Sequence, residues 1–147
     1  MPQSAGKDHI IIANRTGDLR RMTLWLWSFA AAEKLSDQLA QDLDVCANEA
    51  VANIINYAYT DNGTHDISLE LTRLPAGVRL VIRDDGNPFN PLQLPEHVMP
   101  VNLDDAVIGG LGVHLIRRLM THCQYERVGA SNILSLEASE TPAAAHV

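Results

Sequence analysis

The sequence predicts an α+β fold, because it combines helical periodicity with the pattern of an antiparallel hairpin. Apolar residues recur at helical spacing in three segments: 19–30, 36–59 and 111–120. Residues 67–72 alternate between apolar and polar, and residues 78–83 form a second short apolar run, so both segments are expected to be strands. The turn residues Leu-Pro-Ala-Gly at 74–77 lie between them and predict that the two strands pair antiparallel.

The composition is typical of a single globular domain over 1–147, with an ordered core expected at about 9–138. The chain is 46% hydrophobic and 20% charged, and its formal net charge is −7. This charge argues against a nucleic-acid or membrane partner, because either would need an excess of Lys and Arg. Cys46 and Cys123 lack metal-ligand spacing, and no stretch has the pattern of a signal peptide or a membrane span. We therefore expect a cytoplasmic protein with reduced thiols.

The first strand is expected at 9–13, where three consecutive isoleucines favour an extended backbone. Residues 16–18, Thr-Gly-Asp, then predict a turn and a helix cap. The helix that follows has an apolar face suited to packing in the core. Trp25 and Trp27 point to different sides of this helix, so one of them is expected to be exposed and to mark a protein contact.

The central helix is expected to start at Ser36 or Asp37 and to end at the turn of residues 59–63. Its apolar stripe recurs at steps of three and four residues: Leu39, Leu43, Cys46, Ala50, Ile54 and Tyr57. Glu49 and Asn53 lie four residues apart along the edge of that stripe, so their side chains project from one side. Polar groups at the border of a core need partners, so the pair is either structurally hydrogen-bonded or part of a metal or proton-transfer site.

Helical and strand periodicity both fail between residues 84 and 110, a segment that contains four prolines. A loop of this length inside a compact domain is usually a lid or a binding loop, or else it is disordered. Two closing strands are expected after it, at 125–128 and 133–136.

Two glycine motifs flank this loop. The first, Asp84-Asp85-Gly86, ends the strand at 78–83, and by itself it is most simply a turn. The second, Gly109-Gly110-Leu111-Gly112, precedes the last helix, where backbone N–H groups favour a phosphate, although an ordinary loop-to-helix joint has the same pattern. It is not a Rossmann fingerprint, because Leu115 replaces the third glycine, and no Gly-Lys-Ser/Thr follows to make a Walker A loop.

In this order and spacing, the polar helix edge and the two glycine motifs resemble the N, G1 and G2 boxes of the GHKL ATPase superfamily. The resemblance is closest to the RsbW-type anti-sigma serine kinases. The matching stretches are NEAVANIINYAY at 48–59, VIRDDGNPFNP at 81–91 and GGLGVHLIRRLM at 109–120. The resemblance implies the GHKL (Bergerat) ATP-binding fold, a two-layer sandwich in which three helices cover one face of a mixed, mostly antiparallel sheet. A mobile lid over bound ATP would then span 87–108.

The resemblance also implies the roles of individual residues. Asn53 matches the Mg²⁺ ligand, and one oxygen ligand beside phosphates and water suits an ion that stays partly hydrated. Glu49 matches the general base that accepts a proton from the incoming hydroxyl. Asp84 matches the carboxylate that receives the amino group of adenine, and Gly86 gives the base room to approach. The positions that match the phosphate side of the site are Gly110, Leu111 and Gly112.

Several positions depart from the family pattern. Tyr57 stands where relatives often have histidine, and Pro88 replaces the second glycine of a fuller D-x-G-x-G motif. His114 occupies a position that is usually apolar. The last box lacks a Gly-Thr pair and offers only Ser131 and Asn132, so that side of the site is not defined by the motif.

For function, the resemblance implies an ATP-dependent serine protein kinase that is also an anti-sigma factor. Such a protein binds a sigma factor and phosphorylates a serine of a STAS-type anti-anti-sigma protein, which regulates transcription by partner switching. Arg20 and Arg21 resemble a region used for partner contacts, and a homodimer through the first helix is a further expectation. Arg117 and Arg118 either reach phosphate or a partner, or are solvated surface charges.

Two other functions are open at this point. One is an anti-sigma binding module that holds nucleotide but no longer phosphorylates. The other is the catalytic half of a histidine kinase, which is disfavoured because no dimerisation helix with a phosphoacceptor histidine is evident. Loss of phosphoryl transfer on substitution of Glu49 would separate the kinase from the binding module.

Overall fold

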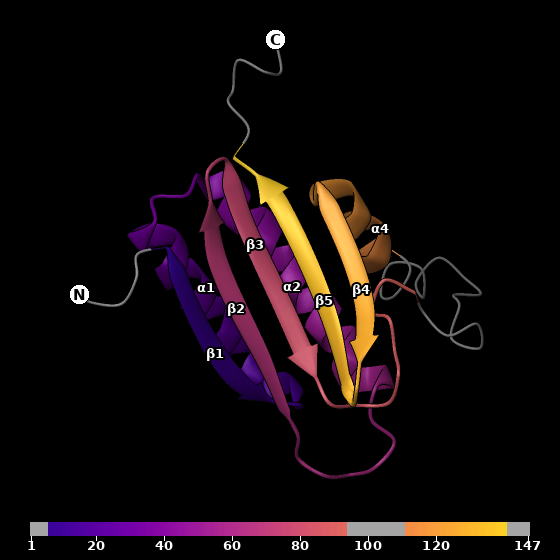
Figure 1. Ribbon diagram of the computed structural model, residues 1–147. Coiled ribbons are helices and arrows are strands. Elements are labelled where there is room, and N and C mark those ends of the chain that lie inside the picture. The colour runs from indigo at the N-terminus through magenta and orange to yellow at the C-terminus, as the bar shows by residue number, and fades with distance from the viewer. Residues whose placement is uncertain (1–5, 94–110, 141–147) are drawn as a thin grey trace.

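The computed structural model describes residues 6–93 and 111–140, which form two layers. One layer is a five-stranded sheet and the other consists of the helices α1, α2 and α4, which lie on one face of that sheet (Figure 1). The prediction of an α+β two-layer sandwich with three covering helices is therefore confirmed. None of the described helices is long and apolar enough to cross a membrane.

The sheet has the strand order β1-β2-β3-β5-β4. Its strands are β1 (Lys7–Ala13), β2 (Asp66–Leu74), β3 (Gly77–Asp84), β4 (His122–Val128) and β5 (Ser131–Ser139). All four pairings between these described strands are antiparallel, including the hairpin of β2 and β3 that the turn residues predicted. The chain returns from β3 to the far edge of the sheet before β5 closes the gap, which places Asn132 of β5 directly opposite Asp84 of β3.

The helices begin and end close to the expected positions. They are α1 (Leu19–Ala32), which follows the short 3₁₀ turn η1 (Thr16–Asp18), α2 (Asp37–Tyr57) and α4 (Leu111–Leu119). Ser36 is the cap of α2, because its hydroxyl accepts a hydrogen bond from the Leu39 amide at 3.1 Å. The cap expected from Asp18 is not formed: its carboxylate instead accepts from the Ala13 amide at 2.8 Å and ties η1 back to the end of β1.

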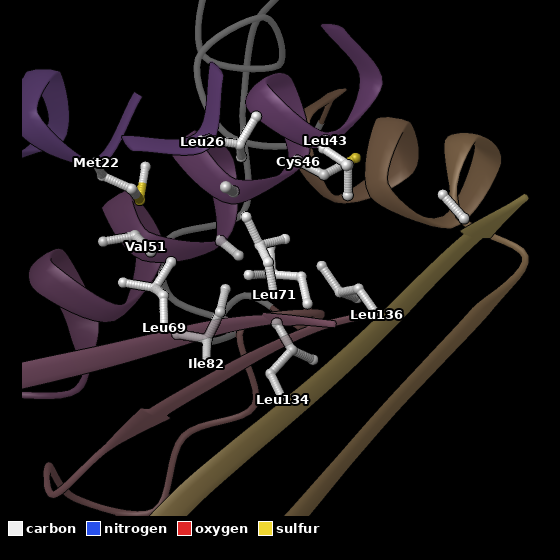
Figure 2. Close-up of a cluster of buried hydrophobic side chains, with 14 of the residues drawn as sticks. Met22, Leu26, Leu43, Cys46, Val51, Leu69, Leu71, Ile82, Leu134 and Leu136 are labelled. Atoms are coloured by element: carbon white, nitrogen blue, oxygen red, sulfur yellow. The ribbon is translucent and has the colours of Figure 1, made fainter. Parts of the chain in front are cut away.

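The hydrophobic core fills the space between the helices and the sheet (Figure 2). Fully buried side chains come from both layers: Met22, Leu26, Leu43, Cys46 and Val51 from the helices, and Leu69, Leu71, Ile82, Leu134 and Leu136 from the strands. Cys46 and Cys123 are free thiols. Burial raises the pKa of the Cys46 thiol to about 12, so this cysteine is a packing residue and not a reactive one.

The expectation that one tryptophan of α1 is exposed is wrong. Trp25 and Trp27 are both half-buried, and the indole N–H of Trp27 donates to Asp44 Oδ2 at 3.2 Å. Both flanks of α1 are covered because the helix packs against β1 as well as against α2. The large apolar side chain that α1 does expose is Leu24, at 58% of its surface.

Candidate functional site

The polar edge of α2 carries two side chains whose hydrogen-bonding capacity is only partly used. Asn53 is buried, and its Nδ2 donates to the Pro91 carbonyl at 3.3 Å. That bond turns Oδ1 away as the free end of the carboxamide, since no described residue donates to it. Glu49 lies one helical turn earlier, is half-buried, and makes neither a hydrogen bond nor an ion pair with the residues at 6–93 and 111–140. Burial raises the pKa of the Glu49 carboxyl, which makes its carboxylate a stronger base.

Asn48 stands in the same motif as Glu49 and Asn53 but serves the fold. Its Nδ2 donates to Asp44 Oδ1 at 2.7 Å and to the Asp44 carbonyl at 2.8 Å, and it also contacts Thr23 Oγ1 at 3.0 Å. Asn48 therefore joins α2 to α1. Of the two interpretations of the Glu49 and Asn53 pair, the structural one describes the bond from Asn53 to Pro91, and the metal or proton-transfer one stays a prediction.

Asp84 lies at the end of β3 and exposes only 3% of its surface. Two N–H groups donate to its Oδ1: the Gly86 amide at 2.8 Å and Asn132 Nδ2 at 2.9 Å. No described residue donates to Oδ2, so this oxygen is the one that can accept a ligand hydrogen. Burial raises the pKa of the Asp84 carboxyl, while the two donors on Oδ1 act in the opposite direction.

Gly86 is required by the fold itself. A Cβ at this position would lie 2.7 Å from the carbonyl oxygen and 2.8 Å from the Cβ of Ala58, the residue that ends α2. The next amide, Asn87 N, donates to the same Ala58 carbonyl at 2.7 Å. Gly86 thus lets the turn after β3 pack directly against the end of α2 and brings Asp84 close to the helix that carries Asn53.

The first residues of the predicted lid pack against α2. Leu92 is buried in the core, and the ring of Phe89 lies 5.8 Å from the ring of Tyr57. Asn53 holds the Pro91 carbonyl from the other side, as described above. The rest of the predicted lid, 94–108, lies outside the described residues.

A titratable cluster borders the same turn. The ring of His65 stacks on Tyr59 at 4.6 Å, its Nε2 lies 2.9 Å from Asp61 Oδ1, and its Nδ1 lies 3.6 Å from Asp85 Oδ1. The Tyr59 hydroxyl donates to the same Asp85 oxygen at 3.4 Å. The hydrogen bond from the His65 ring to Asp61 and the charges of both carboxylates raise the pKa of His65. This cluster connects the loop after α2 to the turn after β3.

Residues 12–138 match the family described as histidine kinase-like ATPase domain. The chain belongs to this family. Its similarity to the serine/threonine-protein kinase BtrW of Bordetella bronchiseptica is 34% identity over 118 residues, which cover 80% of this chain and 83% of that protein. Its similarity to the serine-protein kinase RsbW of Oceanobacillus iheyensis is 30% identity over 84 residues. That match covers 54% of this chain and 53% of the relative, so it spans about half of each.

Solved structures of low sequence identity share the fold of this ATPase domain. The RsbU and RsbW domains of Rv1364c from Mycobacterium tuberculosis align with a TM-score of 0.62 at 13% identity, over 90% of this chain and 32% of that one. The histidine kinase domain of EL346 from Erythrobacter litoralis aligns with a TM-score of 0.50 at 18% identity, over 95% of this chain and 65% of that one. The GHKL resemblance and the fold that it implied are confirmed.

The phosphate side of this ATPase domain is described only in part. Gly110 lies outside the described residues, whereas Leu111 and Gly112 form the first turn of α4. Further along α4, His114 is exposed, so the fold does not need an apolar residue there. Arg117 and Arg118 are also exposed and make no ion pair within the described part of the chain. The phosphate contacts of the glycines and the role of the two arginines therefore stay predictions.

The residues near Asn53 fit a magnesium ion that is held mainly by phosphate oxygens and water. No group of three or more His, Cys, Asp or Glu side chains in the described ranges could enclose a metal by itself. Mg²⁺ commonly keeps several waters and binds through one or two protein oxygens plus substrate phosphates. Asn53 Oδ1, which accepts from no residue of 6–93 or 111–140, is an oxygen of that kind, and the bond from Nδ2 to the Pro91 carbonyl orients the carboxamide.

Asn132 is the site residue whose role the motifs did not reveal. It is buried, and its carboxamide contacts Asp84 directly. Its only signal in the sequence was its place where the family has a Gly-Thr pair. The pairing of β3 with β5, which joins segments 48 residues apart, brings the two side chains together.

Proposed function

We propose that this chain is an ATP-dependent serine protein kinase that also acts as an anti-sigma factor in the cytoplasm. It would hold a sigma factor and phosphorylate a serine on a STAS-type anti-anti-sigma protein. The observation that carries the kinase proposal is the half-buried Glu49 carboxylate, which has no partner among the described residues and lies one helical turn before Asn53. The names of the relatives, which are serine-protein kinases, support the same reaction.

In this proposal Glu49 accepts the proton of the substrate serine as its hydroxyl oxygen attacks the γ-phosphorus of ATP. The bond from that phosphorus to the β,γ-bridging oxygen breaks, and ADP leaves. Burial raises the pKa of Glu49, which suits this role because a stronger base takes the proton more readily. A bound Mg²⁺ supplies neutralisation of phosphate charge, and the free Oδ1 of Asn53 is the oxygen that would hold it.

The nucleotide would lie between Asp84 and the start of α4. Asp84 Oδ2 is placed to accept the amino hydrogen of adenine, since the known donors all bind Oδ1. The phosphates would lie at Gly110, Leu111 and Gly112, where the N-terminus of α4 offers free N–H groups and a favourable partial charge. Asp84 and Asn53 both contact the segment 86–93, and Glu49 lies one helical turn before Asn53, which supports one continuous site for base recognition and phosphoryl transfer.

The partner surface is proposed on α1. Leu24 is exposed, and Arg20 and Arg21 lie exposed on the preceding turn, a combination of apolar and basic groups that suits an acidic protein partner. If the sigma factor and the STAS protein compete for overlapping parts of this surface, the nucleotide state selects between them. A second copy of the chain is a further candidate for the same surface.

The deciding experiment is phosphoryl transfer from radiolabelled Mg-ATP to STAS-domain proteins of the same organism, with a serine-to-alanine variant of each as the control. The wild-type chain should label the serine, and Glu49→Gln should lower the rate by about 10²- to 10⁴-fold while ATP binding, measured by calorimetry, is retained. Normal nucleotide binding with no transfer by the wild type would contradict the kinase proposal. The chain would then be a nucleotide-binding anti-sigma module.

A further inference from the structure

Asn132 lies where β5 begins, directly opposite Asp84, and exposes 2% of its surface. Leu134 and Ile82, two residues away on each strand, are buried under the helices, so Asn132 and Asp84 point into the same helix-covered layer. Burial of a carboxamide at this depth is unfavourable unless its hydrogen bonds are satisfied.

The carboxamide of Asn132 uses its full hydrogen-bonding capacity. Its Nδ2 donates to Asp84 Oδ1 and to the Asn87 carbonyl, each at 2.9 Å. Its Oδ1 accepts from a backbone amide, a phenol and a guanidinium: Phe89 N at 3.1 Å, Tyr125 Oη at 2.5 Å and Arg127 Nη1 at 3.2 Å. A carboxamide has two donors and two lone pairs, so no position is left over. Rotation by 180° would set the NH₂ group against three donors, so the carboxamide is held in one orientation.

This orientation fixes what Asp84 can do. Asn132 Nδ2 and the Gly86 amide both donate to Asp84 Oδ1, so a proton on that oxygen would be unfavourable. The two donors stabilise the ionised carboxylate against its burial and leave Oδ2 as the acceptor that faces the ligand. A buried acceptor of this kind favours a base with an amino group. A carbonyl oxygen at the same place would be repelled, and a hydrogen there would leave Oδ2 unpaired.

The same carboxamide also holds the segment that follows β3. It contacts Asn87 and Phe89, while Arg127 Nη1 donates to the Gly86 carbonyl at 2.7 Å as well as to Asn132. Strand β4, through Arg127, is thereby attached to the turn that carries Asp84. Loss of the carboxamide would remove its bonds to Asn87 and Phe89, while the bonds of Arg127 to Gly86 and of Asn87 to Ala58 would remain.

We infer that Asn132 is a positioning residue that sets the base specificity of the nucleotide site. It donates to Asp84 Oδ1, which keeps Oδ2 as the acceptor, and it anchors the turn of 86–89 to β4. The inference rests on the proposed nucleotide site, because it assigns Asp84 to the base. Its chemical consequence is selection of 6-aminopurine nucleotides over 6-oxopurine nucleotides, through a residue that does not contact the base.

The experiment compares the dissociation constants of ATP and inosine triphosphate for the wild type and for Asn132→Asp, by calorimetry between about pH 6 and about pH 8. The variant keeps the side-chain size but replaces the donor to Asp84 with a second carboxylate, so the two acids share a proton. We expect the preference for ATP to fall at least about tenfold and the ATP affinity to decrease as the pH rises, whereas the wild-type affinity stays flat. Ser135→Ala, three residues away on the opposite face of β5, is the control and should match the wild type.

Equal losses for ATP and inosine triphosphate, or an unchanged preference with a flat pH profile, would overturn the inference, because a purely structural role predicts one of these results. If Asn132→Asp does not fold, Tyr125→Phe decides: it removes one donor to the carboxamide and should lower the preference about two- to fivefold. An unchanged preference in Tyr125→Phe would then overturn the inference. These readouts need no protein substrate, so a wild type that selects ATP but transfers no phosphate would refute only the kinase proposal.

Discussion

Two polar regions border the same hydrophobic core, and they differ in how completely their hydrogen bonds are satisfied. At the base end, Asn132 uses every donor and acceptor of its carboxamide, and Asp84 Oδ1 holds two N–H groups. At the polar edge of α2, the Glu49 carboxylate and the Oδ1 of Asn53 have no partner in the described part of the chain. The first region holds its side chains in fixed positions, whereas the second presents oxygen atoms that a ligand can bind.

The contrast is clearest between two asparagines of one helix. The NH₂ group of Asn48 donates to Asp44 of α2 and to Thr23 of α1, whereas that of Asn53 donates to the Pro91 carbonyl and its oxygen accepts from no described residue. A buried polar atom that is left without a protein partner is unfavourable in the free protein. An unpaired polar atom of this kind therefore points to a ligand. An atom whose hydrogen bonds are all made points instead to a role in positioning its neighbours.

Replacing the ligand acceptor at the base end should produce the largest effect. In Asp84→Asn the new oxygen can keep both donors, but an NH₂ group then faces the amino group of adenine. ATP affinity should fall about 10- to 100-fold or more, because a charge-assisted bond is lost and two donors oppose each other. Calorimetry measures the affinity, and an undiminished ATP affinity would remove Asp84 from the nucleotide site.

The same Asp84→Asn substitution should stabilise the nucleotide-free protein at neutral pH. Burial raises the folded pKa of Asp84 above its ordinary value of 3.8. Its contribution to stability is therefore complete below that value and is lost as the pH rises through the folded pKa. Urea unfolding of the wild type and the variant at pH 7 and at low pH tests the sign: the advantage of the variant should shrink on acidification.

At the polar edge of α2, Asn53→Ala should weaken Mg-dependent ATP binding by at least about tenfold and leave Mg-independent binding almost unchanged. Asn48→Ala is the matched control on the same helix. It should lower the free energy of unfolding by about 1–3 kcal/mol, because the hydrogen bonds from Asn48 to Asp44 and Thr23 are lost, but it should not change the effect of magnesium. ATP titrations with and without Mg²⁺ distinguish the two variants. If both variants responded to Mg²⁺ in the same way, Asn53 would have no role in magnesium binding that Asn48 lacks.

Gly86→Ala tests how tightly the base end is packed. Its Cβ would lie 2.7 Å from the Ala58 carbonyl oxygen, and neither backbone can move away easily. We expect a loss of about 1–3 kcal/mol in the free energy of unfolding, from overpacking. Gly17→Ala is the control, because a Cβ there meets nothing within 4 Å, and it should change stability little. Equal stabilities of the two variants would show that the turn after β3 is free to move.

The smallest expected effect concerns His65. Its pKa is raised above the ordinary value of 6.5, first by the hydrogen bond with Asp61, so the protonated form favours the folded state. That contribution is complete below 6.5 and is lost as the pH rises through the raised value. The unfolding free energy of the wild type should therefore fall with pH across this window relative to His65→Gln. Parallel pH profiles of the two unfolding free energies would mean that protonation of the His65 ring does not affect stability.

Much of the fold and the position of the polar edge of α2 were predictable from local patterns. Periodicity located each helix and strand, and the spacing of Glu49 and Asn53 put both on one edge of α2, because residues four apart in a helix share a side. Local patterns gave wrong expectations for the helix cap at Asp18 and for the exposure of the tryptophans of α1. Asp18 found a better donor at the end of β1, and β1 covered a flank of α1 that the helical pattern alone left exposed.

The sequence by itself determined which elements form, which residues face the core, and which motifs lie at strand and helix ends. Only the tertiary structure decided which of those polar residues make all their hydrogen bonds and which have no partner among the described residues. The reason is that strand register and helix packing join distant segments: β3 with β5 places Asn132 on Asp84, and the end of α2 meets the turn at Gly86. Periodicity reports the side to which a residue points, but the partner that it meets there depends on how the whole core packs.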